Sequence, residues 1–120
     1  MTDLQARLRR DLTAALRERD RESTRVLRTV LAAIANAEAT PHVDDRPPSL
    51  RSHGRIAGAT EGLAATEVAR RDLDDGEVAA VVASERDERL AAAVDLEARG
   101  ALDSATSLRA EAALLGPYVD

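Results

Sequence analysis

The sequence predicts an all-α protein made of two antiparallel helical hairpins, with four main helices joined by a long loop. Apolar residues recur at helical spacing in four stretches, and two of these stretches begin with capping-box residues. The 120-residue chain has no Phe or Trp and one Tyr, so its core has to be built from Leu, Val, Ile and Ala. Alanine is the best helix former, which also favours the all-α class.

The first hairpin is predicted within the first forty residues. Thr2 and Gln5 have capping-box spacing ahead of a helix that runs to about Glu18. The second helix should begin near Asp20, after a tight turn, and end before Pro41, because the residue before a proline is pushed out of helical geometry. The stripes expected to face the core are Leu4, Leu8, Leu12, Ala15 and Leu16, followed by Val26, Leu27, Val30, Leu31, Ile34 and Ala37.

A flexible loop and a short connector are predicted for residues 41–72, which are rich in proline and glycine and have no sustained period. The second hairpin is predicted for residues 73–120, and the three segments together make one domain. The loop also contains both histidines, His42 and His53. No helix or strand spacing aims them at a metal ion, so we predict no metal site.

The third helix has the strongest start signal. Asp74 is the predicted N-cap, Glu77 completes a capping box, and Leu73 and Val78 are spaced as a hydrophobic staple. Gly100 is the predicted left-handed stop. The inner face is expected to hold Val78, Val81, Val82, Leu90, Ala93 and Val94.

The fourth helix is expected to be capped by Asp103 and to end at Gly116 and Pro117. Its predicted inward positions are Ala105, Leu108, Ala112 and Leu115.

Composition excludes several classes of protein and site. Without cysteine there is no disulfide, thiolate nucleophile or zinc-thiolate site. No apolar stretch is long enough for a signal peptide or a membrane span, so we expect a cytoplasmic protein without a membrane partner. All seventeen basic residues are arginine, as codons of high G and C content favour, and the net charge of −5 argues against a general nucleic-acid-binding protein. No DNA partner is expected.

Arginines nevertheless share one face of the first hairpin. At 100° per residue, Arg21, Arg25 and Arg28 lie opposite the apolar face of their helix, and Arg10 and Arg17 lie together on the outer side of the first helix. These two stripes either form a basic surface for RNA or are an ordinary solvated face. Exposed ion pairs on a helix contribute only about 0.3–0.5 kcal/mol each, so spacing alone leaves both interpretations open.

Charged residues also interrupt the apolar stripe of the third helix, at Glu85, Arg86 and Arg89. Glu85 and Arg89 are four residues apart with the acid nearer the amino terminus, which is the favourable orientation. We interpret them as a half-buried ion pair at the edge between the hairpins, with a polar contact for a partner as the alternative. The sequence contains no nucleophile with a positioned base and no phosphate loop, so no cofactor is predicted.

The order of segments resembles the GatB/YqeY family. Members have an acidic residue and Ala in the first helix, a charged turn, a Val-Leu-Arg step and an Ala-Ala-Ile-x-Asn-Ala-Glu end. The corresponding positions are Asp11, Ala14, Arg19, Asp20, Val26 to Arg28, and Ala32 to Glu38. Residues 73–115 are similar to the second hairpin of the family, with an Arg near Arg89 and a glycine turn at Gly100.

This resemblance implies a relation to the helical region of the B subunit of the glutamine-dependent tRNA amidotransferase, a carbon–nitrogen ligase. The related region helps to position tRNA, while the catalytic centres lie on other domains. Full-length relatives continue into a small helical tail domain associated with tRNA contact, so a short form without that tail is expected here.

Two functions remain open from the sequence. The first is a tRNA-binding module accessory to amidation, and the second is a protein-interaction or homodimerisation module without RNA binding. The residues expected to bind tRNA or a partner are Arg10, Arg17, Arg21, Arg25, Arg28 and Arg89.

Overall fold

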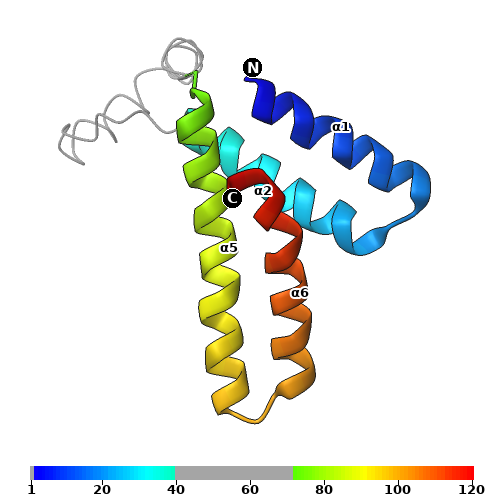
Figure 1. The fold of residues 1–120 in the computed structure, drawn as a ribbon, viewed down its shortest axis with the longest axis vertical. Helices are drawn as coiled ribbons and strands as arrows, with labels where there is room; N and C mark the ends of the chain where they lie inside the picture. Colours follow the sequence, from blue (N-terminus) through cyan, green and yellow to red (C-terminus); the bar gives the residue numbers. More distant parts are fainter. Residues whose placement is uncertain (1, 40–71) are drawn as a thin grey trace, which may run out of the picture. The chain divides into compact units, whose positions relative to one another are not determined.

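The computed structural model describes residues 2–39 and 72–120, and these form four α-helices without a strand. The helices are α1 (Asp3–Glu18), α2 (Arg21–Ala39), α5 (Asp75–Ala98) and α6 (Leu102–Val119) (Figure 1). α1, α2 up to Ile34, α5 and α6 belong to one compact unit. The predicted all-α class is confirmed, while the loop and connector predicted for residues 41–72 lie, apart from Asp72, outside the described residues.

The α1–α2 hairpin begins and turns where the sequence predicts. The Thr2 hydroxyl accepts a hydrogen bond from the Gln5 N–H at 3.1 Å, and the Gln5 side chain accepts one from the Thr2 N–H at 3.3 Å. Arg19 forms the turn in the left-handed conformation, with φ of 57°. The Asp20 carboxylate then accepts the Ser23 N–H at 3.1 Å, which caps α2 and starts it one residue later than its predicted beginning.

The start and end of α5 are also as predicted. The Asp74 carboxylate accepts the Glu77 N–H at 2.8 Å and the Glu77 carboxylate accepts the Asp74 N–H at 3.1 Å, which completes the capping box. The staple positions Leu73 and Val78 are both buried. Gly100 has φ of +83°, the left-handed geometry expected after the helix.

Both predicted ends of α6 were wrong. Asp103 lies in the first turn and does not cap the helix, because the N-cap position is Ala101, which has no side-chain acceptor. The helix also continues through Pro117 to Val119. A proline in the last turn removes one backbone donor, and the contacts of Tyr118 described below hold that turn in place.

The core is thin and aliphatic. α5 and α6 are the most closely packed pair of helices, because α6 presents Ala105 and Ala112 to its neighbour and small side chains allow close approach. The buried apolar residues are Leu8, Ala15, Val26, Leu27, Val30, Ile34, Leu73, Val78, Val82, Ala93, Ala105, Ala112 and Leu115.

Three residues assigned to inner faces are exposed, namely Leu16, Leu90 and Val94 at 46%, 41% and 61%. The buried line of α5 passes through Val82 and Ala93, and Leu90 and Val94 lie about 60–120° round the helix from that line. Because α6 lies so close to α5, it covers only a narrow strip, and the larger residues beside the strip remain outside.

Polar contacts join the two hairpins. The Leu4 N–H in the first turn of α1 donates to the Asp75 carboxylate at 3.2 Å, which supplies a partner to a donor that the helix itself leaves unpaired. At the other end of α5 and α6, the chain turns back between Ala98 and Leu102 with no contact to the first hairpin visible in Figure 1. The first hairpin therefore meets the amino-terminal half of α5 and the carboxyl-terminal half of α6.

Candidate nucleic-acid interface

A groove of about 680 Å³ lies along the α1–α2 turn, and four arginines line it. We call it the arginine groove. Its residues are Leu16, Arg19, Arg21, Thr24, Arg25, Arg28 and Thr29. Three of the four arginines belong to the predicted stripe on α2, and the fourth, Arg19, comes from the turn.

Helical spacing explains why three of these side chains lie together. Arg21, Arg25 and Arg28 are separated by four and three residues, so they share one face of α2 over roughly 10 Å at 1.5 Å per residue. Val26, Leu27 and the other buried residues of α2 occupy the opposite face. The turn then folds Arg19 back to the same groove from the end of α1.

Arg19 occupies a backbone conformation that favours glycine. Among the described non-glycine residues it alone has a positive φ, and its backbone N–H bonds to the carbonyls of Ala15 and Leu16. An L-residue in this conformation costs roughly 1–2 kcal/mol relative to a right-handed one. The sequence analysis identified Arg19 only as a turn residue and missed its place in the groove. An arginine at a turn between two helices could have indicated that its side chain lies beside the arginines that follow it.

The four groove arginines differ in their partners. Arg25 donates to the Glu111 carboxylate of α6 at 2.7 Å, with its side chain still 64% exposed. For Arg19, Arg21 and Arg28, no carboxylate of the described residues lies within ion-pair distance. Three guanidinium groups, each with five donors, are thus available to an anion in solution.

Asp20 lies between the groove arginines Arg19 and Arg21 in the sequence. Its carboxylate accepts the Ser23 hydroxyl at 2.7 Å and the Ser23 N–H at 3.1 Å. These hydrogen bonds hold the pKa of Asp20 below its ordinary value, so the group stays ionised and is committed to capping α2.

The net charge of −5 is distributed unevenly between the hairpins. Residues 1–40 contain eight Arg and six Asp or Glu, a net +2, whereas residues 73–120 contain four Arg and eleven Asp or Glu, a net −7. The arginine groove therefore lies on the basic part of an acidic chain, and the overall charge is a poor guide to the field at this surface.

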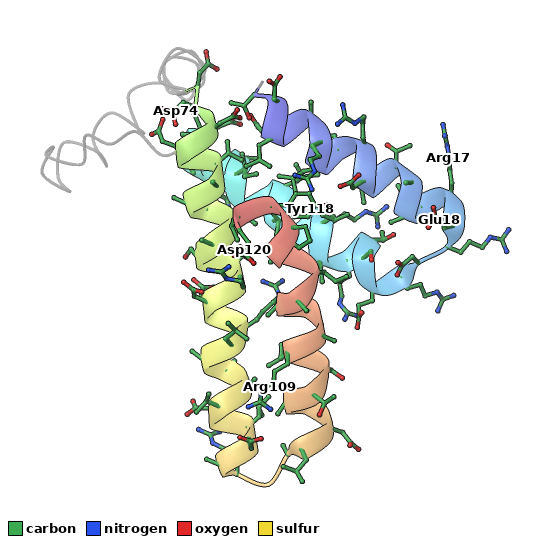
Figure 2. The ribbon with its side chains drawn as sticks, in the orientation of Figure 1. Arg17, Glu18, Asp74, Arg109, Tyr118 and Asp120 are labelled. Atoms are coloured by element: carbon green, nitrogen blue, oxygen red, sulfur yellow. The ribbon has the colours of Figure 1, made fainter. Side chains whose placement is uncertain are left out.

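The other predicted site residues do not join the groove. Arg10 and Arg17 are exposed on α1 but do not line it, and Figure 2 shows the Arg17 side chain projecting away from α1. The structure thus gathers Arg21, Arg25 and Arg28 but not the five-residue surface drawn from the two stripes.

Arg89 is held within the second hairpin. Its guanidinium donates to Glu85 on its own helix and to Glu111 on α6, both at 3.1 Å, and its side chain is 13% exposed. The half-buried ion pair interpreted from sequence matches this geometry, and Glu111 extends it into a chain of charges from Glu85 to Arg25. Little of the guanidinium remains for a ligand, so we leave Arg89 out of the candidate surface.

A second, smaller cavity of about 190 Å³ lies between α1, α2 and α6, beside Tyr118. The Tyr118 hydroxyl donates to the Asp11 carboxylate, and the Arg7 guanidinium lies 4.8 Å from the centre of the ring. Burial, and then the adjacent Asp11, raise the pKa of Tyr118. The single aromatic ring of the protein is therefore a structural anchor and does not offer a stacking platform for a base.

The described residues contain no group of three or more His, Asp or Glu side chains that could hold a metal ion, and none of their helices is both long and apolar enough to cross a membrane. Comparison with protein-family models, with curated proteins and with solved structures finds no match. Function has to be inferred from the surface itself, together with the sequence resemblance.

Proposed function

We propose that this chain is a GatB/YqeY-like helical module that binds tRNA through the arginine groove and is accessory to tRNA-dependent amidation. The observation that carries the proposal is the gathering of Arg19, Arg21, Arg25 and Arg28 around one groove, three of them without an acidic partner among the described residues.

The size of the groove fits a nucleic-acid backbone. Each strand of a duplex carries about one charge per 3.4 Å, so the roughly 10 Å between Arg21 and Arg28 spans about three phosphates. Arginine binds phosphate through two parallel hydrogen bonds, and Thr24 adds a hydroxyl donor, whereas the Thr29 hydroxyl donates to the Arg25 carbonyl at 3.0 Å. Contacts of this kind fix a backbone without reading its bases, which suits a module that positions tRNA.

The conformation of Arg19 supports a binding role for the groove. Glycine would relieve the left-handed backbone at this position, whereas arginine keeps a guanidinium at the groove. Unfavourable backbone conformations of this kind are enriched at functional sites.

The specific identification of tRNA rests on the sequence resemblance, and the groove itself supports an RNA backbone in general. An experiment can distinguish specific binding of tRNA from general binding of an RNA backbone. Preference for tRNA over a duplex RNA of equal length would support the finer proposal, while equal binding would support only the coarser one.

The test is binding of labelled tRNA by fluorescence anisotropy over a salt series. Neutralising about three phosphates should weaken binding roughly thirtyfold between 50 and 200 mM salt. Replacing Arg21, Arg25 and Arg28 together by glutamine should remove most of this affinity and flatten the salt dependence. Arg99→Gln is the matched control, because Arg99 is exposed on the second hairpin. Equal binding by wild type and the triple variant would contradict the proposal.

A further inference from the structure

An exposed apolar strip covers the side of the α5–α6 hairpin that faces away from the first hairpin. Leu90 and Val94 on α5 and Leu102 on α6 are 41%, 61% and 59% exposed. Helical spacing places Leu102 within about 40° of Thr106 and Ala113 on α6, and about 160–180° from Glu111 and Tyr118, which contact the first hairpin. We call this surface the outer face. Its residues are Leu90, Val94, Leu102, Thr106, Arg109 and Ala113.

Two ion pairs cross the outer face from one helix to the other. Arg86 of α5 donates to Asp120, the residue after α6, at 3.0 Å, and Arg109 of α6 donates to Glu97 of α5 at 3.2 Å. Figure 2 shows Arg109 and Asp120 between the two ribbons. In each pair the opposite charges lie on different sides of the hairpin, so the charges on this face are largely compensated.

This arrangement of charge is self-complementary. A twofold axis parallel to the helices, between α5 and α6, would place α5 of one copy against α6 of the other. Arg86 would then face Asp120 of the second copy, and Glu97 would face Arg109. Every charge of the two crossing pairs would meet its opposite, with no like charges opposed among them.

The side chains of α5 and α6 are also complementary in size when α5 of one copy faces α6 of the other. α5 contributes the larger apolar residues Leu90 and Val94, while α6 has only Thr106, Ala110 and Ala113 at the same levels of the hairpin. In the arrangement above, the larger side chains of one copy pack on the small ones of the other. An α5 to α5 arrangement would instead oppose Leu90 and Val94 to each other, beside the acidic Asp87 of both copies.

We propose that the outer face is a homodimer interface in which α5 of one copy packs on α6 of the other. The shared length of 18 residues corresponds to about 27 Å, and two helices are about 20 Å wide, so the face measures on the order of 500 Å². Stable dimers bury about 800 Å² per partner, and we therefore expect a weak dimer with micromolar Kd. This inference does not depend on RNA binding.

Sedimentation of the purified chain from 2 to 200 µM tests the proposal. We expect the mass to rise from one chain of 12.8 kDa towards two. Val94→Glu should weaken dimerisation at least tenfold, whereas Ser84→Glu, which adds the same charge at an exposed position on another side of α5, should leave it unchanged. Far-ultraviolet circular dichroism should show equal helix content in both variants. A chain that stays at 12.8 kDa throughout, or equal weakening by both variants, would overturn the proposal.

The packing arrangement has a separate test, because the chain contains no cysteine of its own. A mixture of the single variants Val94→Cys and Thr106→Cys should form a disulfide-linked dimer on oxidation, since these positions would face each other across the interface. Val94→Cys alone should remain unlinked. Rapid linking of Val94→Cys to itself, or no linking in the mixture, would contradict the α5 to α6 arrangement.

Discussion

The two hairpins use the same residue, arginine, in opposite ways. In the second hairpin three of the four arginines, Arg86, Arg89 and Arg109, are each paired with carboxylates of the same hairpin, and Arg99 is exposed. In the first hairpin Arg19, Arg21 and Arg28 have no such partner among the described residues, and Arg25 reaches across to α6. Partnership within the fold, rather than the number of arginines, distinguishes arginines that stabilise this protein from arginines that can serve a ligand.

The contrast extends to apolar residues. The second hairpin compensates charge across its outer face and exposes Leu90, Val94 and Leu102 there, which suits another protein surface. The first hairpin leaves charge uncompensated, which suits a polyanion. The two proposed interactions should therefore respond differently to salt: tRNA binding weakens steeply, while the dimer, whose facing charges are balanced, changes much less.

The largest effect on stability is expected from Arg89→Met. The substitution leaves Glu85 and Glu111 part-buried, at 17% and 13% exposure, without their shared cation. We expect a loss of about 2 kcal/mol in the free energy of unfolding, less than for a fully buried pair because water still reaches the site. Urea denaturation measures this loss, and tRNA affinity should stay within twofold.

Arg99→Met is the matched control for Arg89→Met, because Arg99 is exposed and has no carboxylate partner among the described residues. It should change the free energy of unfolding by less than about 0.5 kcal/mol. If both variants lose equal stability, the proposed distinction between paired arginines that stabilise the fold and unpaired arginines that do not is wrong.

Glu111→Gln should lower the stability of the protein and also change tRNA binding by the first hairpin. The Glu111 carboxylate binds Arg25 at 2.7 Å and Arg89 at 3.1 Å, so its loss should lower stability by about 1 kcal/mol. It should also release Arg25 to the groove and tighten tRNA binding about threefold. Isothermal titration at 50 mM salt measures the affinity, and unchanged or weaker binding would show that Arg25 contributes nothing to the groove.

Tyr118→Phe tests the link between α6 and α1. At neutral pH the loss of the hydrogen bond to Asp11 should cost about 1–2 kcal/mol. The pKa of Tyr118 is raised in the folded protein, so its contribution is fully present below the ordinary value near 10 and is lost as pH rises above it. Denaturation at pH 8 and pH 11 should show a smaller gap between wild type and variant at the higher pH. A gap independent of pH would contradict this account.

Arg19→Gly should have only a small effect on stability, and the sign of that effect is the informative part. Relief of the left-handed backbone should raise the free energy of unfolding by about 0.5 kcal/mol, while the loss of a groove guanidinium should weaken tRNA binding severalfold. Opposite signs in melting temperature and affinity would show that arginine is kept at this turn for binding. A variant that gains stability and binds equally well would remove Arg19 from the site.

Local features of this fold could be predicted from the sequence because their causes lie within a few residues. The capping residues Thr2 and Asp74, the turn at Arg19 and Asp20 and the stop at Gly100 each act on backbone groups one turn away. The same holds for the arginine stripe of α2, since spacing on one helix fixes which side chains are neighbours.

Features that depend on another helix could not be predicted in this way. Whether Leu90 and Val94 are covered depends on how closely α6 approaches, which the small residues of α6 decide. The ion pair between Arg25 and Glu111 joins positions 86 residues apart, and the residue pattern of neither helix predicts it. Pro117 ended the predicted helix on local grounds, yet the contact of Tyr118 with α1 holds the last turn.

The division between the two hairpins is tested most directly by mapping tRNA contacts with backbone amide shifts of the ¹⁵N-labelled protein. We expect tRNA at 50 mM salt to shift the amide signals of Arg19, Arg21, Arg25 and Arg28 and to leave those of Leu90, Val94 and Arg109 unchanged. Shifts concentrated on α5 and α6, or no shifts at any tRNA concentration, would contradict it.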